Sequence, residues 1–140
     1  MRFLFVFVLT LACSFHANAA TLESSDAAVA VTDQAMKRIA SGDLRDAFEI
    51  VKPYMVIPAA EVDAILGQAE LQQPMLVVRF GKSIGYELIR NDTVGDSLVQ
   101  VVYLQKFEKH AMVWRFILYG GTGEWTINSF KYADDISSAF

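Results

Sequence analysis

Cysteine is nearly absent from this chain of 140 residues, which contains one, Cys13, and only two histidines. An internal disulfide needs two cysteines, and a structural zinc site usually needs about four Cys or His ligands. The one cysteine also lies in an N-terminal stretch that we expect to be removed. The sequence therefore excludes an internal disulfide, argues against cysteine catalysis and zinc-thiolate sites, and predicts no cofactor.

An excess of basic charge is also missing, since 12 Lys and Arg residues stand against 16 Asp and Glu, for a net charge of -4. The two signs are interspersed, and no stripe of Lys and Arg occurs. Proteins that bind nucleic acid or anionic membranes usually carry such a basic patch. The composition thus predicts neither of these partners.

The N-terminus, "MRFLFVFVLTLACSFHANAA", has one basic residue, an apolar run from Phe3 to Ala12, and small residues at Ala17 and Ala19. This is the layout of a secretory signal peptide. We therefore expect residues 1–19 to be cleaved and the protein to be exported, either to a periplasm or to the medium. The run is well short of the roughly 20 residues that cross a bilayer, so we expect no stable membrane span.

Lipid anchoring through Cys13 is a second possible fate. The sequence "TLAC" resembles a bacterial lipoprotein cleavage box, although Thr10 stands where leucine is usual. In both cases the remainder, residues 20–140, is long enough for one compact domain.

The first half of this domain has the apolar spacing of helices, with Gly42, Pro53 and Pro58 as separators. Three helices are expected, over residues 26–41, 44–52 and 59 onward. The end of the third helix is open. The helical spacing of apolar residues continues beyond Pro74, but the sequence "MLVV" would also suit a short strand. The sequence therefore leaves two alternatives open for residues 71–80, a helix or a strand. We favour a kinked or restarted helix up to Phe80, with Gly81 as its terminator.

The second half reads as four strands separated by short turn sequences, which predicts an antiparallel meander. The expected strands are residues 84–90, 97–107, 110–119 and 124–132. Helices followed by strands are typical of the α+β class. We therefore expect N-terminal helices packed on a bent four-stranded antiparallel sheet.

The central strands are apolar on both faces. Trp114 and Phe116 alternate with Val113 and Ile117, whereas a sheet with one wet face would alternate apolar with polar residues. The helices can cover one face. For the other we predict a second copy in a homodimer or another partner, because monomers seldom expose large apolar patches. In the alternative, the helices and the C-terminal segment wrap both faces.

Four segments carry a resemblance to a known family: "FGKSIGYELI", "DSLVQVVYLQKFEKHAMVWRFILY", the turn "GGTGEW" and the closing "INSFKYADDISSAF". They resemble small exported bacterial proteins of the nuclear transport factor two-like superfamily, over residues 25–140. The resemblance rests on aromatics and glycines and implies a cone-shaped sheet around a pocket. Members include isomerases, dehydratases and protein-binding scaffolds, and the catalytic ones usually place an Asp or His inside the cone. No Asp-His pair can be aligned here, which weakens the enzyme reading.

Residues 81–85, "GKSIG", match the G-x-S-x-G pattern of a hydrolase nucleophile. That nucleophile follows a strand and precedes a helix, whereas here a helix precedes and a strand follows. We interpret Gly81 and Gly85 as the junction between helix and sheet, and we do not expect Ser83 to act as a nucleophile.

The remaining motifs are interpreted as turns. "GGTG" at 120–123 is expected to form a hairpin turn. The Asp residues of the turns do not match the spacing of a calcium-binding loop, so no metal site is predicted.

Four side chains of the expected sheet are candidates for binding a ligand: Arg115, Tyr86, Glu87 and Tyr103. Arg115 ranks first, because a covered guanidinium needs a partner. No catalytic residue is predicted. The expected function is a non-catalytic module that binds a small apolar molecule or a protein. The alternative is an isomerase, dehydratase or hydrolase, which should show a buried carboxylate or imidazole that faces an open pocket.

Overall fold

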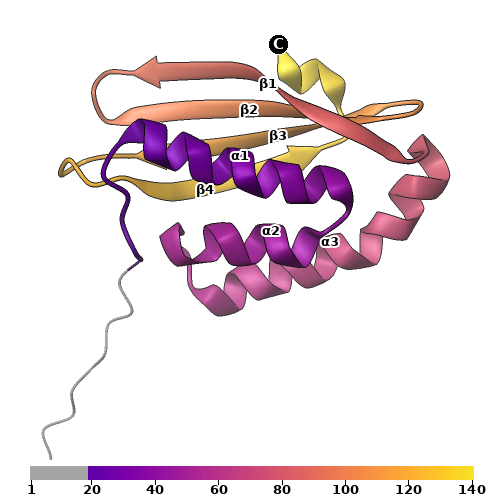
Figure 1. The fold of residues 1–140 in the computed structure, drawn as a ribbon, viewed down its shortest axis with the longest axis horizontal. Coiled ribbons are helices and arrows are strands. Elements are labelled where there is room, and N and C mark those ends of the chain that lie inside the picture. Colours follow the sequence, from indigo (N-terminus) through magenta and orange to yellow (C-terminus); the bar gives the residue numbers. More distant parts are fainter. Residues whose placement is uncertain (1–18) are drawn as a thin grey trace, which may run out of the picture.

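The computed structural model describes residues 19–140, so the predictions about the signal peptide and Cys13 fall outside the described residues. Three helices come first and four strands follow, with a short 3-10 helix after the second helix and another after the last strand (Figure 1). The expected α+β order is confirmed. Between residues 19 and 140, no helix combines the length and the apolar character needed to cross a membrane.

Helix α1 (Ser25–Ser41) owes both of its ends to local chemistry. Ser24 is the N-cap, and its hydroxyl accepts a hydrogen bond from the Ala27 amide at 3.1 Å. Gly42 ends the helix in the left-handed conformation, at a φ of 91°, as the sequence predicts. The buried residues of α1 recur at helical spacing and face the sheet: Ala28, Thr32, Ala35, Met36 and Ile39.

Helix α2 (Leu44–Val51) continues into the 3-10 helix η1 (Lys52–Tyr54), and α3 (Ala59–Phe80) follows. The helical alternative for residues 71–80 is correct, because α3 runs through Pro74 and ends at Gly81. Pro74 removes one backbone hydrogen bond of the helix. Side chains buried on both sides of it, Leu66 and Phe80, hold the two halves of α3 in place and offset that loss.

The sheet is an antiparallel meander in the order β1-β2-β3-β4. Its strands are β1 (Ser83–Val94), β2 (Leu98–Phe107), β3 (Ala111–Tyr119) and β4 (Thr126–Ala133). The largest difference from the expected boundaries is at the end of β1: residues 91–94 belong to this strand, whereas the sequence placed them in a turn. Asn91, Asp92 and Thr93 pair with β2 residues from Val101 back to Val99. The hydrogen-bonded ladder therefore outweighs the low strand propensity of Asn and Asp.

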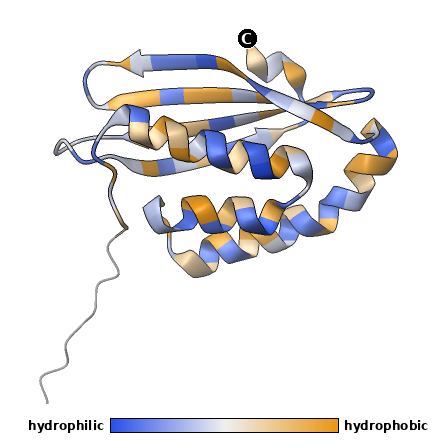
Figure 2. Cartoon of the chain, in the orientation of Figure 1, coloured by the Kyte–Doolittle hydropathy of each residue, from blue (hydrophilic) through white to orange (hydrophobic). Residues whose placement is uncertain are grey.

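The helices cover one face of the sheet, which we call the inner face (Figure 1). Its large buried side chains come from the three later strands: Val101, Tyr103, Trp114, Phe116, Leu118 and Ile127. Phe48 of α2 packs edge-on against Phe130 of β4, with ring centroids 5.4 Å apart. Figure 2 shows that β2 is mostly apolar, with only a few hydrophilic positions. The main core thus lies between the helices and the inner face.

The C-terminal segment lies against the opposite, outer face. The 3-10 helix η2 (Ile136–Ala139) is held there by Arg115, whose Nη2 donates to the Ser138 carbonyl at 2.6 Å. Beneath it Val102 and Val113 are buried, at 0% and 3% exposure. The C-terminal segment therefore covers part of this face. Other apolar residues of the face stay exposed, so a dimer through this face remains a prediction.

Arg115→Leu is expected to loosen η2 while leaving the domain folded. The guanidinium holds the Ser138 carbonyl, and hydrogen bonds to charged groups contribute about 1.5 to 3 kcal/mol. Hydrogen exchange of the Ser138 and Phe140 amides should accelerate about tenfold. Lys131→Leu, at the exposed neighbour of Arg115 on β4, is the matched control and should change neither amide. Equal exchange in both variants would contradict this role of Arg115.

Candidate functional site

Two of the candidate residues, Tyr86 and Tyr103, lie together on the inner face beside α1, with ring centroids 6.2 Å apart. The Tyr103 hydroxyl shares a hydrogen bond with Thr32 Oγ1 at 2.9 Å, and the Tyr86 hydroxyl donates to Asp33 Oδ2 at 3.2 Å. Burial raises the pKa of Tyr103 to about 12. Burial, and then the nearby Asp33, also raise the pKa of Tyr86. Both hydroxyls are therefore protonated at neutral pH and occupied with α1.

The other two candidates, Arg115 and Glu87, lie on the outer face. Glu87 Oε2 is 3.8 Å from the ammonium of Lys106. Arg115 Nη2 is bound to η2, while its Nε is buried with no hydrogen-bond partner in the described part of the chain. Because successive residues of a strand point to opposite faces, Arg115 cannot meet the Tyr103 group through the sheet. The four candidates therefore form two separate groups and no common pocket.

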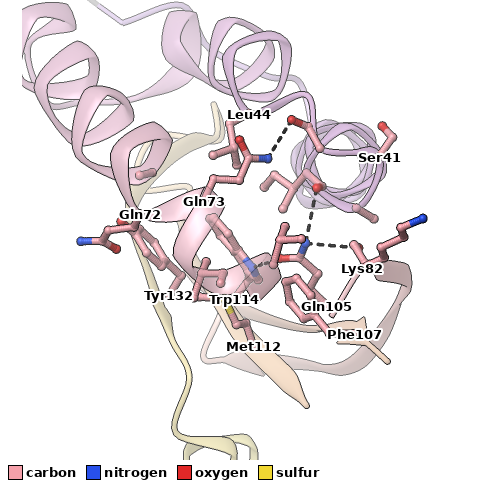
Figure 3. A pocket seen from close by; sticks show the side chains of 17 residues that line it. Ser41, Leu44, Gln72, Gln73, Lys82, Gln105, Phe107, Met112, Trp114 and Tyr132 are labelled. Carbon is pink, nitrogen blue, oxygen red and sulfur yellow. Dashed lines mark hydrogen bonds between the residues drawn. The ribbon is translucent and has the colours of Figure 1, made fainter. Parts of the chain in front are cut away.

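A cavity of about 250 Å³ lies elsewhere on the inner face, between the end of α1, the middle of α3 and the sheet (Figure 3). Its walls are mostly apolar: Ile39, Leu44, Ala69, Leu76, Met112 and Trp114. Polar side chains line the remainder: Ser41, Gln72, Gln73, Ser83 and Gln105. Its volume lies close to the lower end of the range for small-molecule sites, about 300 to 1,000 Å³. This cavity is the best candidate for a functional site.

Gln105 is the central polar group of the cavity and is only 6% exposed. Its Oε1 accepts a hydrogen bond from Trp114 Nε1 at 3.0 Å. Since an indole nitrogen can only donate, this bond fixes which end of the amide faces Trp114. Gln105 Nε2 then donates to the Ile39 carbonyl at 3.4 Å and to Ser83 Oγ at 3.3 Å. Both distances exceed the usual 2.9 to 3.0 Å, so these two bonds are weak.

The charged and titratable groups of the cavity are few. Lys82 lies at its edge, and its amino group extends away from the other labelled side chains (Figure 3). Tyr132 lines the wall, and burial raises the pKa of its hydroxyl, which favours the neutral form. Within residues 19–140, no group of three or more His, Cys, Asp or Glu side chains is placed to hold a metal ion. The cavity is thus a neutral and largely apolar space.

The "GKSIG" segment forms the expected junction between α3 and β1. Gly81 ends α3 at a φ of 84°, and β1 begins at Ser83. Ser83 lines the cavity, but the geometry gives it no general base. His110, the one histidine in the described range, binds the Asp134 carbonyl at 2.8 Å and packs against the Phe80 ring. The structure therefore agrees with the interpretation of this segment as a junction.

The sequence did not identify Gln105 or the cavity. A sign was present, because Gln105 follows Val101 and Tyr103 at the period of two that places residues on one face of a strand. A buried glutamine among apolar neighbours must be hydrogen-bonded, and such a residue merits attention. The partners of Gln105, however, come from β1, β3 and α1. Only the folded chain brings them together.

Comparison with known proteins adds no assignment. No family model, no curated protein and no solved structure matches this chain.

Proposed function

We propose that this protein is an exported, non-catalytic binding module that takes a small, largely apolar molecule into the cavity between α1, α3 and the sheet. The observation that carries the proposal is the composition of the walls. They combine apolar side chains with one buried amide, Gln105, and a few neutral polar groups. Apolar walls with few polar groups are typical of small-molecule sites.

The enzyme alternative receives less support from the same cavity. An isomerase or hydrolase needs a group that takes up or gives a proton close to the substrate. The side chains that line this cavity include no Asp, Glu or His, and the amino group of Lys82 extends outward. The export assignment rests on the N-terminal sequence. The likeness to the nuclear transport factor two-like superfamily, which rests on the sequence segments described above, is part of the same proposal.

Filling the cavity is expected to abolish binding. Ala69 lines the cavity and is 5% exposed, so Ala69→Leu should place its larger side chain in the binding space. The neutral dye N-phenyl-1-naphthylamine, which fluoresces in apolar surroundings, is a suitable probe. We expect the wild type to bind it and Ala69→Leu to bind it at least tenfold more weakly, which corresponds to about 1.4 kcal/mol.

Ala64→Leu is the matched control, because Ala64 lies on the same helix but is exposed. This variant should bind the dye as the wild type does. Circular dichroism checks that both variants are folded. Equal binding by the Ala69 and Ala64 variants, or no binding by the wild type, would refute the proposed site.

A further inference from the structure

We propose that the cavity selects an elongated neutral molecule that ends in a carbonyl oxygen, such as a ketone or an ester, and that Gln105 and Ser83 bind this oxygen. The inference rests on the proposed binding function and adds the chemical class of the ligand. It follows from which hydrogen-bonding groups in the cavity are firmly bonded and which are only weakly bonded or free.

The first donor is Gln105 Nε2, whose two protons are both engaged but only in long bonds. Trp114 holds the amide so that the NH2 end faces Ser83 and the Ile39 carbonyl, and both of its bonds are long, at 3.3 and 3.4 Å. A ligand oxygen at about 2.9 Å would replace a weak bond with one of normal length. The Trp114 contact keeps the NH2 end of the amide directed toward this side of the cavity.

The second donor, the hydroxyl of Ser83, is free. Its oxygen accepts the bond from Gln105, and the described residues supply no acceptor for its proton. Ser41, the other serine of the cavity, differs in this respect because its hydroxyl donates to the Arg38 carbonyl at 3.0 Å. Gln105 and Ser83 therefore offer two neighbouring donors. A carbonyl oxygen has two lone pairs and can accept from both.

The charge of the ligand follows from the same surroundings. A carboxylate would have to lose its hydration in a cavity whose nearest cation, Lys82, extends away from Gln105. Burial of an unpaired charge is strongly unfavourable. A neutral carbonyl group avoids that cost, so we expect a ketone or an ester to bind better than the corresponding acid.

The length of the ligand follows from a second hollow that adjoins the cavity. This hollow, of about 750 Å³, lies between the last turns of α3 and the end of β4. Gln72, Leu76, Met112 and Tyr132 line both spaces. Beyond them lies Met75 of α3, which is 74% exposed. The Arg79–Asp134 ion pair also lines the hollow, but its other walls are mostly apolar. An alkyl chain too long for the cavity would gain about 0.8 kcal/mol for each methylene that it buries there.

The test is displacement of N-phenyl-1-naphthylamine by defined competitors. We use 2-octanone, the isosteric alkene 2-methyl-1-octene, which lacks the oxygen, and octanoate, which carries the charge. The wild type should prefer 2-octanone to octanoate at least tenfold. Ser83→Ala should lower the ratio of ketone to alkene affinity about fivefold, the usual effect of one neutral hydrogen bond. Ser129→Ala, at a serine of β4 that does not line the cavity, is the control and should leave this ratio unchanged.

Gln105→Glu tests the other donor, because a carboxylate can accept from Trp114 and Ser83 but has no proton to donate. If this variant folds, it should lose the ketone preference at neutral pH. If it does not fold, the ratio of ketone to alkene affinity in Ser83→Ala and in its serine control tests the proposed head group without it. The longer 2-undecanone should bind more tightly than 2-octanone, and a lack of gain would refute the chain path through the hollow.

The failures of the two proposals are distinguishable. If the competitors displace the dye, but the two serine variants keep the same ratio of ketone to alkene affinity, the ligand class is wrong and the cavity function stands. Stronger binding of octanoate than of 2-octanone also overturns the neutral head group. If neither the dye nor any competitor binds, the cavity function itself is wrong.

Discussion

Gly81→Ala is expected to lower the free energy of unfolding by about 3 kcal/mol. Gly81 has φ 84° and ψ -168°, a backbone region that is essentially restricted to glycine. A Cβ at this position would also meet the side chain of Glu108, whose own Cβ would be 2.9 Å away. Glu108 cannot move without cost, because its Oε2 accepts the Lys82 amide at 3.1 Å. Urea unfolding at neutral pH measures the effect.

Gly67→Ala is the matched control in the same helix. Gly67 lies in the interior of α3, and an added Cβ there would have no atom within 4 Å. Alanine is favoured over glycine inside a helix by about 0.5 to 1 kcal/mol. The same substitution should therefore stabilise the protein at residue 67 and destabilise it at residue 81. A loss of similar size at both positions would contradict the account of Gly81.

Raising the pH from 10 to 12 is expected to lower the free energy of unfolding by about 2 kcal/mol through Tyr103 alone. Burial raises the pKa of Tyr103 in the folded protein to about 12, while an unfolded tyrosine titrates near 10. Between these values the unfolded chain releases the proton and the folded protein keeps it. The stabilisation is complete below pH 10 and is lost as the pH rises to about 12. Urea unfolding at a series of pH values measures the loss.

Tyr103→Phe isolates this contribution. At pH 7 the variant should be about 1 kcal/mol less stable, because it loses the hydrogen bond between Tyr103 and Thr32. Thr32 keeps its own bond to the Val29 carbonyl at 2.8 Å, which limits the loss. The variant should lose less stability above pH 10, so the two curves should cross. Tyr119→Phe, at an exposed tyrosine, is the control, and a parallel pair of curves for Tyr103→Phe would refute the prediction.

The ends of the helices were predictable because they depend on local chemistry. Gly42 and Gly81 take backbone conformations that favour glycine, and Pro58 immediately precedes α3. The continuation of α3 beyond Pro74 was less certain. The sequence shows a missing amide hydrogen at Pro74, but it does not show that Phe80, at the end of the helix, is buried between the helix and the sheet. Burial of this side chain offsets the hydrogen bond lost at Pro74.

The candidate ligand residues were harder to place for a different reason. Alternation along one strand places Arg115 and Trp114 on opposite faces, but it does not show which face the helices cover. The pairing of Glu87 with Leu104, next to Tyr103, depends on a register that includes two bulges in β1. The strand pairings therefore place Tyr86 and Tyr103 on the inner face and Glu87 and Arg115 on the outer face. They also placed Gln105 beside Trp114 and Ser83, which no pattern in the sequence had joined.

The sequence alone determined the α+β class, the order of helices and strands, and the glycine junction at residues 81–85. Each of these depends on neighbours along the chain: the spacing of apolar residues, a backbone angle, or a turn. Only the tertiary structure decided which residues share a cavity and that the C-terminal segment covers part of the outer face. Both depend on contacts between residues far apart in the chain, such as Arg115 with Ser138 and Gln105 with Ile39. The free energy of such contacts comes from burial and pairing in the folded protein, and no local pattern records it.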